Sequence, residues 1–254
     1  MIEEVRKMGL NYYGTSDIGK KQEVMEDAFT GFIVNDKVLF VCIADGLGAK
    51  RGTDAASLLA VEEFRKYMLT NLKSDKIEDI EKETKTALYM INRMIYNYQR
   101  INPELYGNFS STFTAVAINL RKEILITHIG NTRFYLFRQG KLFQMTKDDT
   151  VAQKLLEKRE IQENEYPMHP DRGVLIKFLG MPEVEPYITK GSLLTNDVVL
   201  LVTNGVYEML TPDKIEQIIM NTETSQQACE WIIEGANEMG GIDNSAVVIS
   251  YINF

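Results

Sequence analysis

Four short β-patterned segments follow one another in the middle of the chain, and their spacing is what most limits the fold. They span Thr112–Asn119, Glu123–Gly130, Arg133–Arg138 and Lys141–Thr146, and short turns separate them. Turns this short join antiparallel strands, because a parallel pair needs a crossover of about a dozen residues or more. The segments therefore predict an antiparallel meander and argue against repeated βαβ units.

A hairpin and a helix pair precede this meander. Phe29–Val34 and Val38–Ala44 are β-rich segments around the turn at 35–37, which favours an antiparallel hairpin. Apolar residues then recur at helical spacing in Thr53–Leu72 and Ile77–Arg100. These two patterns predict a layer of two long helices.

A second helix pair lies between two further strands at the C-terminal end. The strands are predicted at Asp197–Thr203 and Asn244–Tyr251. Thr211 followed by a proline opens a helix over Pro212–Met220. A capping box at Thr224 opens another that runs to about residue 239, where two glycines end it.

The order of these elements predicts an α+β fold of antiparallel sheets with helices on the outside, in a single domain over residues 1–254. The segment Lys147–Ser192 is polar, contains four prolines and has one helical patch near Val151–Arg159. It has too few periodic apolar residues to bury a core of its own. We therefore expect an excursion from the sheet here, not a second domain.

Composition excludes several classes of protein. The net charge is −8, and lysines and arginines are scattered among acids, so we expect no nucleic-acid partner. Cys42 and Cys229 lie in apolar patterns and form no C-x-x-C pair, which predicts reduced core residues. The charged N-terminus lacks an apolar leader and no long apolar run occurs, so we expect a cytoplasmic protein without a membrane partner.

Acidic and amide side chains stand at four predicted strand ends. Asp45 and Gly46 follow the apolar segment Val38–Ala44, and the other three ends lie at 26–27, 203–205 and 241–244. Singly, such residues are common turn formers. If the four ends converge, however, their oxygen atoms would form a cage that suits Mg²⁺ or Mn²⁺.

Two other interpretations of the glycine loop after Asp45 are disfavoured. The spacing of Gly46, Gly48 and Gly52 misses the dinucleotide fingerprint by one residue, and no G-x-x-x-x-G-K-[ST] motif is present. An aspartyl-phosphate nucleophile of the haloacid-dehalogenase type would want a second aspartate where Leu47 stands.

Six short motifs run through the chain in order. They are Ser16–Gly19 with Met25–Phe29, Ala44–Gly48, Ser110–Thr112, His128–Arg133, Thr203–Gly205 and Gly240–Asn244. The first resembles the first motif of the PPM family, the metal-dependent Ser/Thr protein phosphatases of type 2C. The others resemble that family's A-D-G-M-G, G-[ST]-T, H-x-G-D-S-R, S-D-G and G-G-x-D-N. Because six motifs in one order are specific together, the chain is identified as a bacterial-like, single-domain member.

The resemblance implies a four-layer αββα sandwich of two antiparallel sheets, with a flap subdomain over roughly 147–192. It also implies hydrolysis of phosphomonoesters on Ser/Thr-phosphorylated proteins by a water that bridges two Mn²⁺ or Mg²⁺ ions, with no protein nucleophile. The expected partner is therefore a phosphorylated protein.

Site residues follow from the resemblance by position. Asp45 would bridge the two ions, the Gly46 carbonyl and Glu26 would serve the second ion, and Asp243 the first. The expected catalytic residues are Asp45 and Asp243. The expected metal ligands are Glu26, Asp27, Asp45, Gly46, Asn204 and Asp243, with Asn131 as a weaker member. The expected substrate-binding residues are Gln22, Lys21, His169 and Arg172.

Three positions depart from the family pattern, and each loses a charge. Asn204 and Asn131 stand where the family has aspartates, and Gln22 stands where it has an arginine that grips phosphate. The first metal site should therefore be weakened. A lost charge-assisted grip on phosphate is typically worth about 1.5–3 kcal/mol. Two functions stay open at this point. The protein is either an active phosphatase or a catalytically impaired module that binds phosphoproteins or has a regulatory role.

Overall fold

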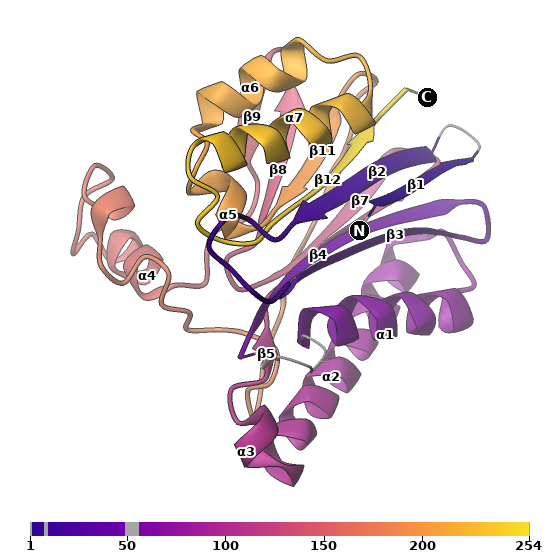
Figure 1. Cartoon of the computed structure of the whole chain (residues 1–254). Helices are drawn as coiled ribbons and strands as arrows, with labels where there is room; N and C mark the ends of the chain where they lie inside the picture. Colours follow the sequence, from indigo (N-terminus) through magenta and orange to yellow (C-terminus); the bar gives the residue numbers. More distant parts are fainter. Residues whose placement is uncertain (1, 8–9, 49–55, 254) are drawn as a thin grey trace.

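Two stacked antiparallel sheets form the centre of the protein (Figure 1). The computed structural model describes residues 2–7, 10–48 and 56–253. The first sheet has the strand order β1-β2-β12-β11-β8-β9, and the second has the order β10-β7-β6-β4-β3, with the short β5 paired to β4. All strand pairs in both sheets are antiparallel.

The bounds of the strands and helices are as follows. The first sheet holds β1 (Ile2–Lys7), β2 (Leu10–Asp17), β8 (Arg133–Arg138), β9 (Lys141–Gln144), β11 (Val198–Val202) and β12 (Ser245–Tyr251). The second holds β3 (Asp27–Val34), β4 (Val38–Leu47), β5 (Ser110–Ser111), β6 (Phe113–Asn119), β7 (Glu123–Ile129) and β10 (Tyr187–Ser192). The helices are α1 (Ala56–Asn71), α2 (Ile77–Ile101), α3 (Pro103–Tyr106), α4 (Val151–Glu157), α5 (Asn204–Tyr207), α6 (Pro212–Met220), α7 (Ser225–Glu238) and the 3₁₀ turn η1 (Tyr166–Met168).

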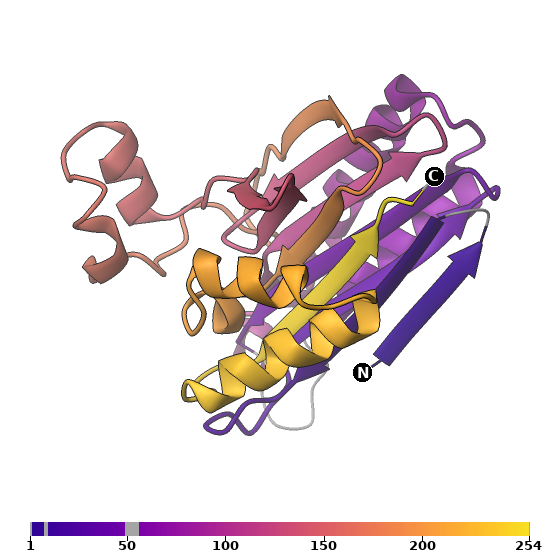
Figure 2. The ribbon, with the colours of Figure 1, turned by 90° about the horizontal axis from the view of Figure 1, so that it is seen from above.

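Helices cover the outer face of each sheet, so the predicted four-layer sandwich is confirmed. Helices α1 and α2 lie on the second sheet, and α6 and α7 lie on the first (Figures 1 and 2). Three apolar layers fill the spaces between them. Phe64 belongs to the layer under α1 and α2, Phe134 to the layer between the sheets, and Ile232 to the layer under α7. Cys42 and Cys229 are buried and form no disulfide with each other, which agrees with the predicted core positions.

The predicted helix boundaries agree closely with the structure. Helix α6 spans the predicted residues, and Thr211 Oγ1 accepts from the backbone N–H of Lys214 (3.4 Å). Thr224 Oγ1 caps α7 in the same way, at 3.1 Å from the N–H of Gln227. The side chain of Gln227 accepts from Glu223 N–H, one residue before the expected partner. Residues 53–55, at the predicted start of α1, lie outside the described residues.

The prediction of one continuous meander is wrong. Strands β6 and β7 pair within the second sheet, whereas β8 and β9 belong to the first. The chain crosses between the sheets at the turn after β7, where Gly130 has φ of +102° and an added Cβ would meet Thr112 at 2.6 Å. Turn length alone does not show this, because a short turn can join strands of one sheet or carry the chain to the facing sheet.

The predicted excursion over 147–192 ends earlier than expected. Tyr187–Ser192 forms the edge strand β10 beside β7. Its residues are mostly exposed, so the sequence of this strand lacks the alternation of apolar and polar residues by which a strand is predicted. Residues 147–186 extend away from the sandwich and contain α4 and η1 (Figures 1 and 2). We refer to residues 147–186 as the projecting segment.

Candidate metal centre

Four chain ends from both sheets meet at one end of the sandwich. Asp27 at the start of β3 faces Asp45 near the end of β4 in the strand register. Thr203, which follows β11, donates its hydroxyl proton to Asp27 Oδ2 (2.7 Å) and so joins the two sheets. Asn204 Nδ2 donates to Asp243 Oδ2 (3.2 Å) just before β12. The convergence expected from the sequence is therefore present.

Backbone contacts hold Asp45 in place. Its N–H donates to Thr112 Oγ1 (2.8 Å), and its carbonyl accepts from Thr112 N–H (2.9 Å) and from Ser111 Oγ (3.2 Å). Strand β5 thereby fixes the end of β4. The motif Ser110–Thr112 was noted in the sequence, but no role was assigned to it.

Glu26 is positioned by its main chain. Its N–H donates to Asn244 Oδ1 (2.7 Å), and its carbonyl accepts from Gly46 N–H (2.9 Å) and from the Ser57 hydroxyl. Asn244 in turn donates through Nδ2 to the carbonyl of Ile18 (2.9 Å). One asparagine thus ties the start of β3 to the segment after β2.

The negative charges of this cluster act on one another. Burial raises the pKa of Asp27 to about 8, and the charges of Asp243 and Glu26 add to this effect, opposed by the hydrogen bond from Thr203. Burial also raises the pKa of Asp45 well above its usual range, followed by repulsion from the other acids. A cluster that resists ionisation in this way is stabilised by a bound cation.

The donor set fits hard divalent ions, because it consists of carboxylate, amide and carbonyl oxygens without a thiolate or imidazole. Within the described part of the chain, no three His, Cys, Asp or Glu side chains are grouped closely enough to form a ready ligand set. The carboxylate oxygens of Asp243 accept hydrogen bonds from Asn204 and Gln22. We refer to Glu26, Asp27, Asp45, Asn204 and Asp243 as the acid cluster.

The two expected phosphate-binding residues near the N-terminus, Gln22 and Lys21, differ in their contacts. Gln22 Nε2 donates to Asp243 Oδ1 (3.0 Å) and contacts the carbonyl of Ile242 (3.4 Å). Lys21 is exposed and makes no ion pair or hydrogen bond with any residue that the structure describes. The structure therefore brings Gln22, but not Lys21, into contact with the acid cluster.

Asn131 contacts the last residue of α5, whereas Asp243 contacts the first. Asn131 is buried, its carbonyl accepts from the Tyr207 hydroxyl (3.1 Å), and its side-chain Oδ1 has no hydrogen-bond partner among the described residues. An unpaired buried acceptor is costly unless it finds a donor or a cation. Its position is compatible with the weaker ligand role expected from the sequence.

His169 and Arg172 lie in the projecting segment. His169 Nδ1 accepts from Asp171 N–H (3.1 Å), which is a local turn contact. Arg172 forms an ion pair with Glu208 (2.9 Å), which caps the C-terminal end of α5. The charge of Glu208 contributes to the raised pKa of Asp45. Only Arg172 thus reaches an element of the site, and Glu208 had no recognisable motif in the sequence.

A second polar network joins the projecting segment to the sandwich. Asp148 accepts from Arg133 through both carboxylate oxygens (2.9 and 2.7 Å) and from the Tyr166 hydroxyl (2.8 Å). The guanidinium of Arg133 lies 3.6 Å from the ring centre of Tyr207. A cavity of about 470 Å³ lies beside this network, between the projecting segment and the chain after α5.

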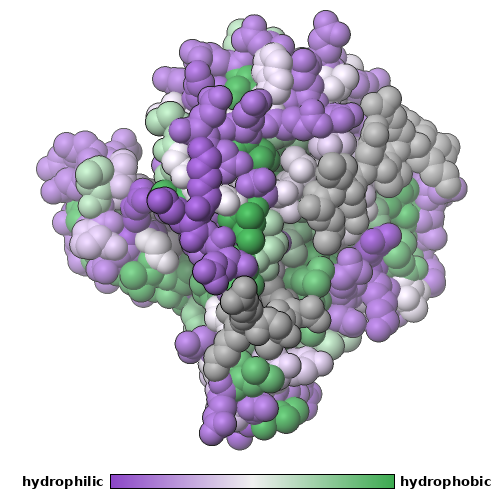
Figure 3. Space-filling view, viewed as in Figure 1, coloured by the Kyte–Doolittle hydropathy of each residue, from purple (hydrophilic) through white to green (hydrophobic). Residues whose placement is uncertain are grey.

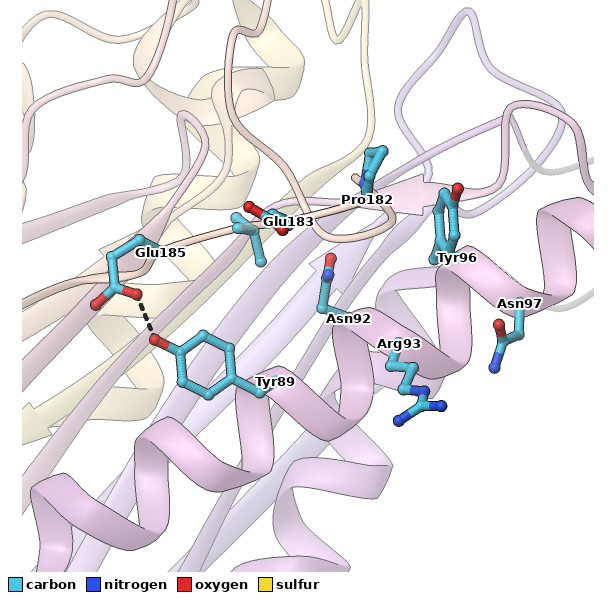
Figure 4. Close-up of a pocket in the computed structure, with 9 residues that line it drawn as sticks. Tyr89, Asn92, Arg93, Tyr96, Asn97, Pro182, Glu183 and Glu185 are labelled. Carbon is cyan, nitrogen blue, oxygen red and sulfur yellow. Dashed lines mark hydrogen bonds between the residues drawn. The ribbon is translucent and has the colours of Figure 1, made fainter.

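A separate groove of about 680 Å³ runs along α2 (Figure 4). The Tyr89 hydroxyl donates to Glu185, and Asn92 Nδ2 donates to the carbonyl of Met181 (2.9 Å). The residues lining this groove come from α2 and from 182–185, and the acid cluster contributes none of them. The groove is therefore not part of the candidate metal centre.

Comparison with known proteins agrees with this fold and site. Residues 13–234 match the family model described as protein phosphatase 2C. The serine/threonine phosphatase stp of Listeria innocua serovar 6a is 27% identical over 237 residues, which cover 92% of each chain. The serine/threonine protein phosphatase PstP of Mycobacterium tuberculosis is 30% identical over 95% of this chain and 45% of its own length.

One solved structure bears on the metals. It is the catalytic domain of the serine/threonine protein phosphatase PstP in complex with 2 manganese ions. It superposes with a TM-score of 0.81 at 25% identity and covers 96% of this chain and 99% of that one.

The chain belongs to the protein phosphatase 2C family. It is a metal-dependent protein Ser/Thr phosphatase by class, and the members of this class use two Mn²⁺ or Mg²⁺ ions.

Proposed function

We propose that the acid cluster binds two Mn²⁺ or Mg²⁺ ions and that the protein uses them to hydrolyse phosphoserine and phosphothreonine in other proteins. The observation that carries this proposal is the convergence of four chain ends, where burial and neighbouring acids raise the pKa of Asp27 and of Asp45. Phosphoproteins are the substrates of this class in general. Among the described residues, no helix is both long and apolar enough to cross a membrane.

Each residue has a proposed role. Asp45 would contact both ions, and the Gly46 carbonyl and Glu26 would serve the second. Asp243 and Asn204 would serve the first. Two such ions lower the pKa of a water molecule shared between them and neutralise charge on the phosphoryl group. The rigid backbone contacts of Asp45 and Glu26 keep their oxygens in position, which limits the cost of reorganisation.

The first ion should bind more weakly than the second. Asn204 supplies a neutral amide, and this amide donates its proton to Asp243, the carboxylate intended for the same ion. Gln22 donates to the other oxygen of that carboxylate. An ion at this site must displace both amides, whereas the hydrogen bonds that position Asp45 and Glu26 are made by their main-chain N–H groups, to Thr112 and Asn244. Activity at low metal concentration should therefore be reduced.

We also propose that the projecting segment is the flap subdomain of the family. Two ion pairs anchor it beside the candidate centre, Arg172 with Glu208 and Asp148 with Arg133 of β8. A segment held in this position can contact a bound phosphoprotein. His169 and Arg172 are the residues within it that we expect to affect substrate binding.

The function is tested by measuring the hydrolysis of p-nitrophenyl phosphate in about 1–10 mM Mn²⁺, because weak metal sites fill at millimolar concentrations. We expect activity in the native protein, loss of at least about a hundredfold in Asp45→Asn, and little change in the control Asp213→Asn. Asp213 lies in the exposed first turn of α6, away from the centre. Equal activity in the native protein and Asp45→Asn would refute the assignment, and an inert native protein that binds no Mn²⁺ would favour a regulatory module.

A further inference from the structure

A small cavity of about 250 Å³ lies between α1 and the junction of α2 with α3. It is smaller than the roughly 300–1,000 Å³ of typical small-molecule pockets, and it suits a single side chain. Helices α2 and α3 and strand β5 come together there, at the lower end of the view in Figure 1. Its lining residues are Leu58, Leu59, Glu62, Glu63, Tyr98, Tyr106 and Phe109.

One wall of the cavity is aromatic. The rings of Tyr98, Tyr106 and Phe109 pack edge to face, with centres 5.2, 5.7 and 6.0 Å apart. Tyr98 is 40% exposed, so it offers ring surface to a partner. Hydrophobic atoms reach the surface at this end of the molecule (Figure 3). Aromatic rings attract cations through their negative faces.

The other wall is acidic and has an apolar base. Glu62 is exposed and has no ion pair or hydrogen bond with another described residue. Among the described residues, Glu63 pairs only with Lys66 (3.4 Å), whose side chain is 75% exposed, and such pairs are weak. None of the lining residues that the structure describes is basic. Leu58 and Leu59 can contact an aliphatic stem, so the cavity suits the side chain of lysine or arginine.

The elements that form the cavity also contact the backbone of the candidate metal centre. Ser57, immediately before Leu58, donates its hydroxyl proton to the carbonyl of Glu26. Phe109 immediately precedes β5, whose Ser111 donates to the carbonyl of Asp45. Glu62 lies five residues further along α1 than Ser57, a rise of about 7.5 Å. An extended peptide covers that distance in about two to three residues.

We propose that this cavity is a subsite for substrate specificity, which takes a lysine or arginine side chain about two or three residues from the phosphorylated residue. The proposal rests on the proposed function, because it assumes that a phosphorylated residue occupies the acid cluster. It names the substrate class more closely, as phosphoproteins with a basic residue near the phosphorylation site.

The test uses phosphonate peptides that resist hydrolysis and differ at one position. In each peptide a phosphonate replaces the phosphate of threonine, and either arginine or its neutral analogue citrulline stands two or three residues away on either side. Fluorescence anisotropy in the presence of Mn²⁺ measures the dissociation constants. We expect arginine to bind about five- to tenfold more tightly than citrulline in at least one position.

Variants locate this preference. Glu62→Gln should reduce the arginine preference to about twofold or less, and Tyr98→Leu should reduce it while Tyr98→Phe retains it. Glu234→Gln, an exposed glutamate on α7, makes the same change of charge elsewhere and should leave the preference intact. The proposal is overturned if no peptide position prefers arginine, or if Glu62→Gln and Glu234→Gln give the same preference.

Failure of the proposed function is recognised separately. Hydrolysis of p-nitrophenyl phosphate by the native protein and by Glu62→Gln should be equal, since this small substrate does not reach the cavity. If neither protein hydrolyses it but the arginine preference persists in the binding assay, the subsite stands and the catalytic assignment falls.

Discussion

Replacement of Asp148 by asparagine should destabilise the protein strongly and release the projecting segment. The Asp148 side chain is 2% exposed and that of Arg133 is 14% exposed. Asparagine has almost the same shape, but it keeps only one acceptor oxygen and turns an NH₂ group toward the guanidinium or toward the Tyr166 hydroxyl. Arg133 would then carry a largely buried charge without its counterion.

The magnitude follows from this burial. Asp148 accepts three hydrogen bonds, of which the two from Arg133 are charge-assisted. Removal of one partner of a buried ion pair costs about 3–5 kcal/mol. For a chain of this size each kcal/mol lowers Tm by about 2–4 °C. We therefore expect Tm to fall by about 6–20 °C.

The chain contains a matched control. Asp197 is also 2% exposed and accepts two hydrogen bonds from Arg138 (2.9 and 2.6 Å), on the side of the first sheet away from the projecting segment. Asp197→Asn should also lower the free energy of unfolding, measured by urea denaturation. Only Asp148→Asn should increase the rate of limited proteolysis within residues 147–186, since only Asp148 contacts Tyr166.

Two results would refute this reasoning. A loss of stability below about 1 kcal/mol in Asp148→Asn would show that the ion pair contributes no more than an exposed one. Equal proteolysis of the projecting segment in both variants would show that Asp148 does not anchor it.

Three further predictions concern the acid cluster. Asn204→Asp should lower the Mn²⁺ concentration for half-maximal activity by about tenfold, because a carboxylate replaces a neutral ligand; unchanged calorimetric affinity and activity would place Asn204 outside the coordination sphere. Gln22→Arg should lower KM for p-nitrophenyl phosphate by about tenfold through a charge-assisted contact; an unchanged kcat/KM in the folded variant would reject this position as a phosphate contact. In the metal-free protein, stability should fall as pH rises from about 4 to about 8, because Asp27 has a pKa of about 8 when folded and 3.8 when unfolded, so the native state binds more protons over this range. Urea denaturation in EDTA between pH 5 and pH 8.5 measures this trend, and a stability that rises with pH would contradict it.

Much of the local structure could be predicted from the sequence. The hairpin of β3 and β4, the two helix pairs and the caps at Thr211 and Thr224 all lie where short-range patterns place them. Local periodicity and capping depend on residues close together in the chain, so they are readable without the fold. Strands β1, β2, β5 and β10 were missed, and β10 lacks an apolar pattern because it is a mostly exposed edge strand.

The site was only partly predictable. Family motifs located Glu26, Asp45 and Asp243, and the structure brings their chain ends together. The same motifs did not reveal that the side chain of Gln22 contacts Asp243, a residue 221 positions away in the sequence. They also did not reveal Glu208 as the partner of Arg172. Such contacts arise between elements that are distant in sequence, so no local pattern records them.

The sequence by itself determined the order of the long helices and of most strands, and the kinds of residue at the strand ends, because neighbouring residues set periodicity, turns and caps. Only the tertiary structure decided that β8 pairs in the first sheet and not beside β7 in the second. The choice of sheet depends on which face of the strand can be buried. The tertiary structure also decided that two side-chain amides donate hydrogen bonds to Asp243 and that an acidic, aromatic cavity forms between α1 and the junction of α2 with α3. Packing of distant segments creates both features, and it creates the electrostatic coupling between acids that singly are ordinary turn residues.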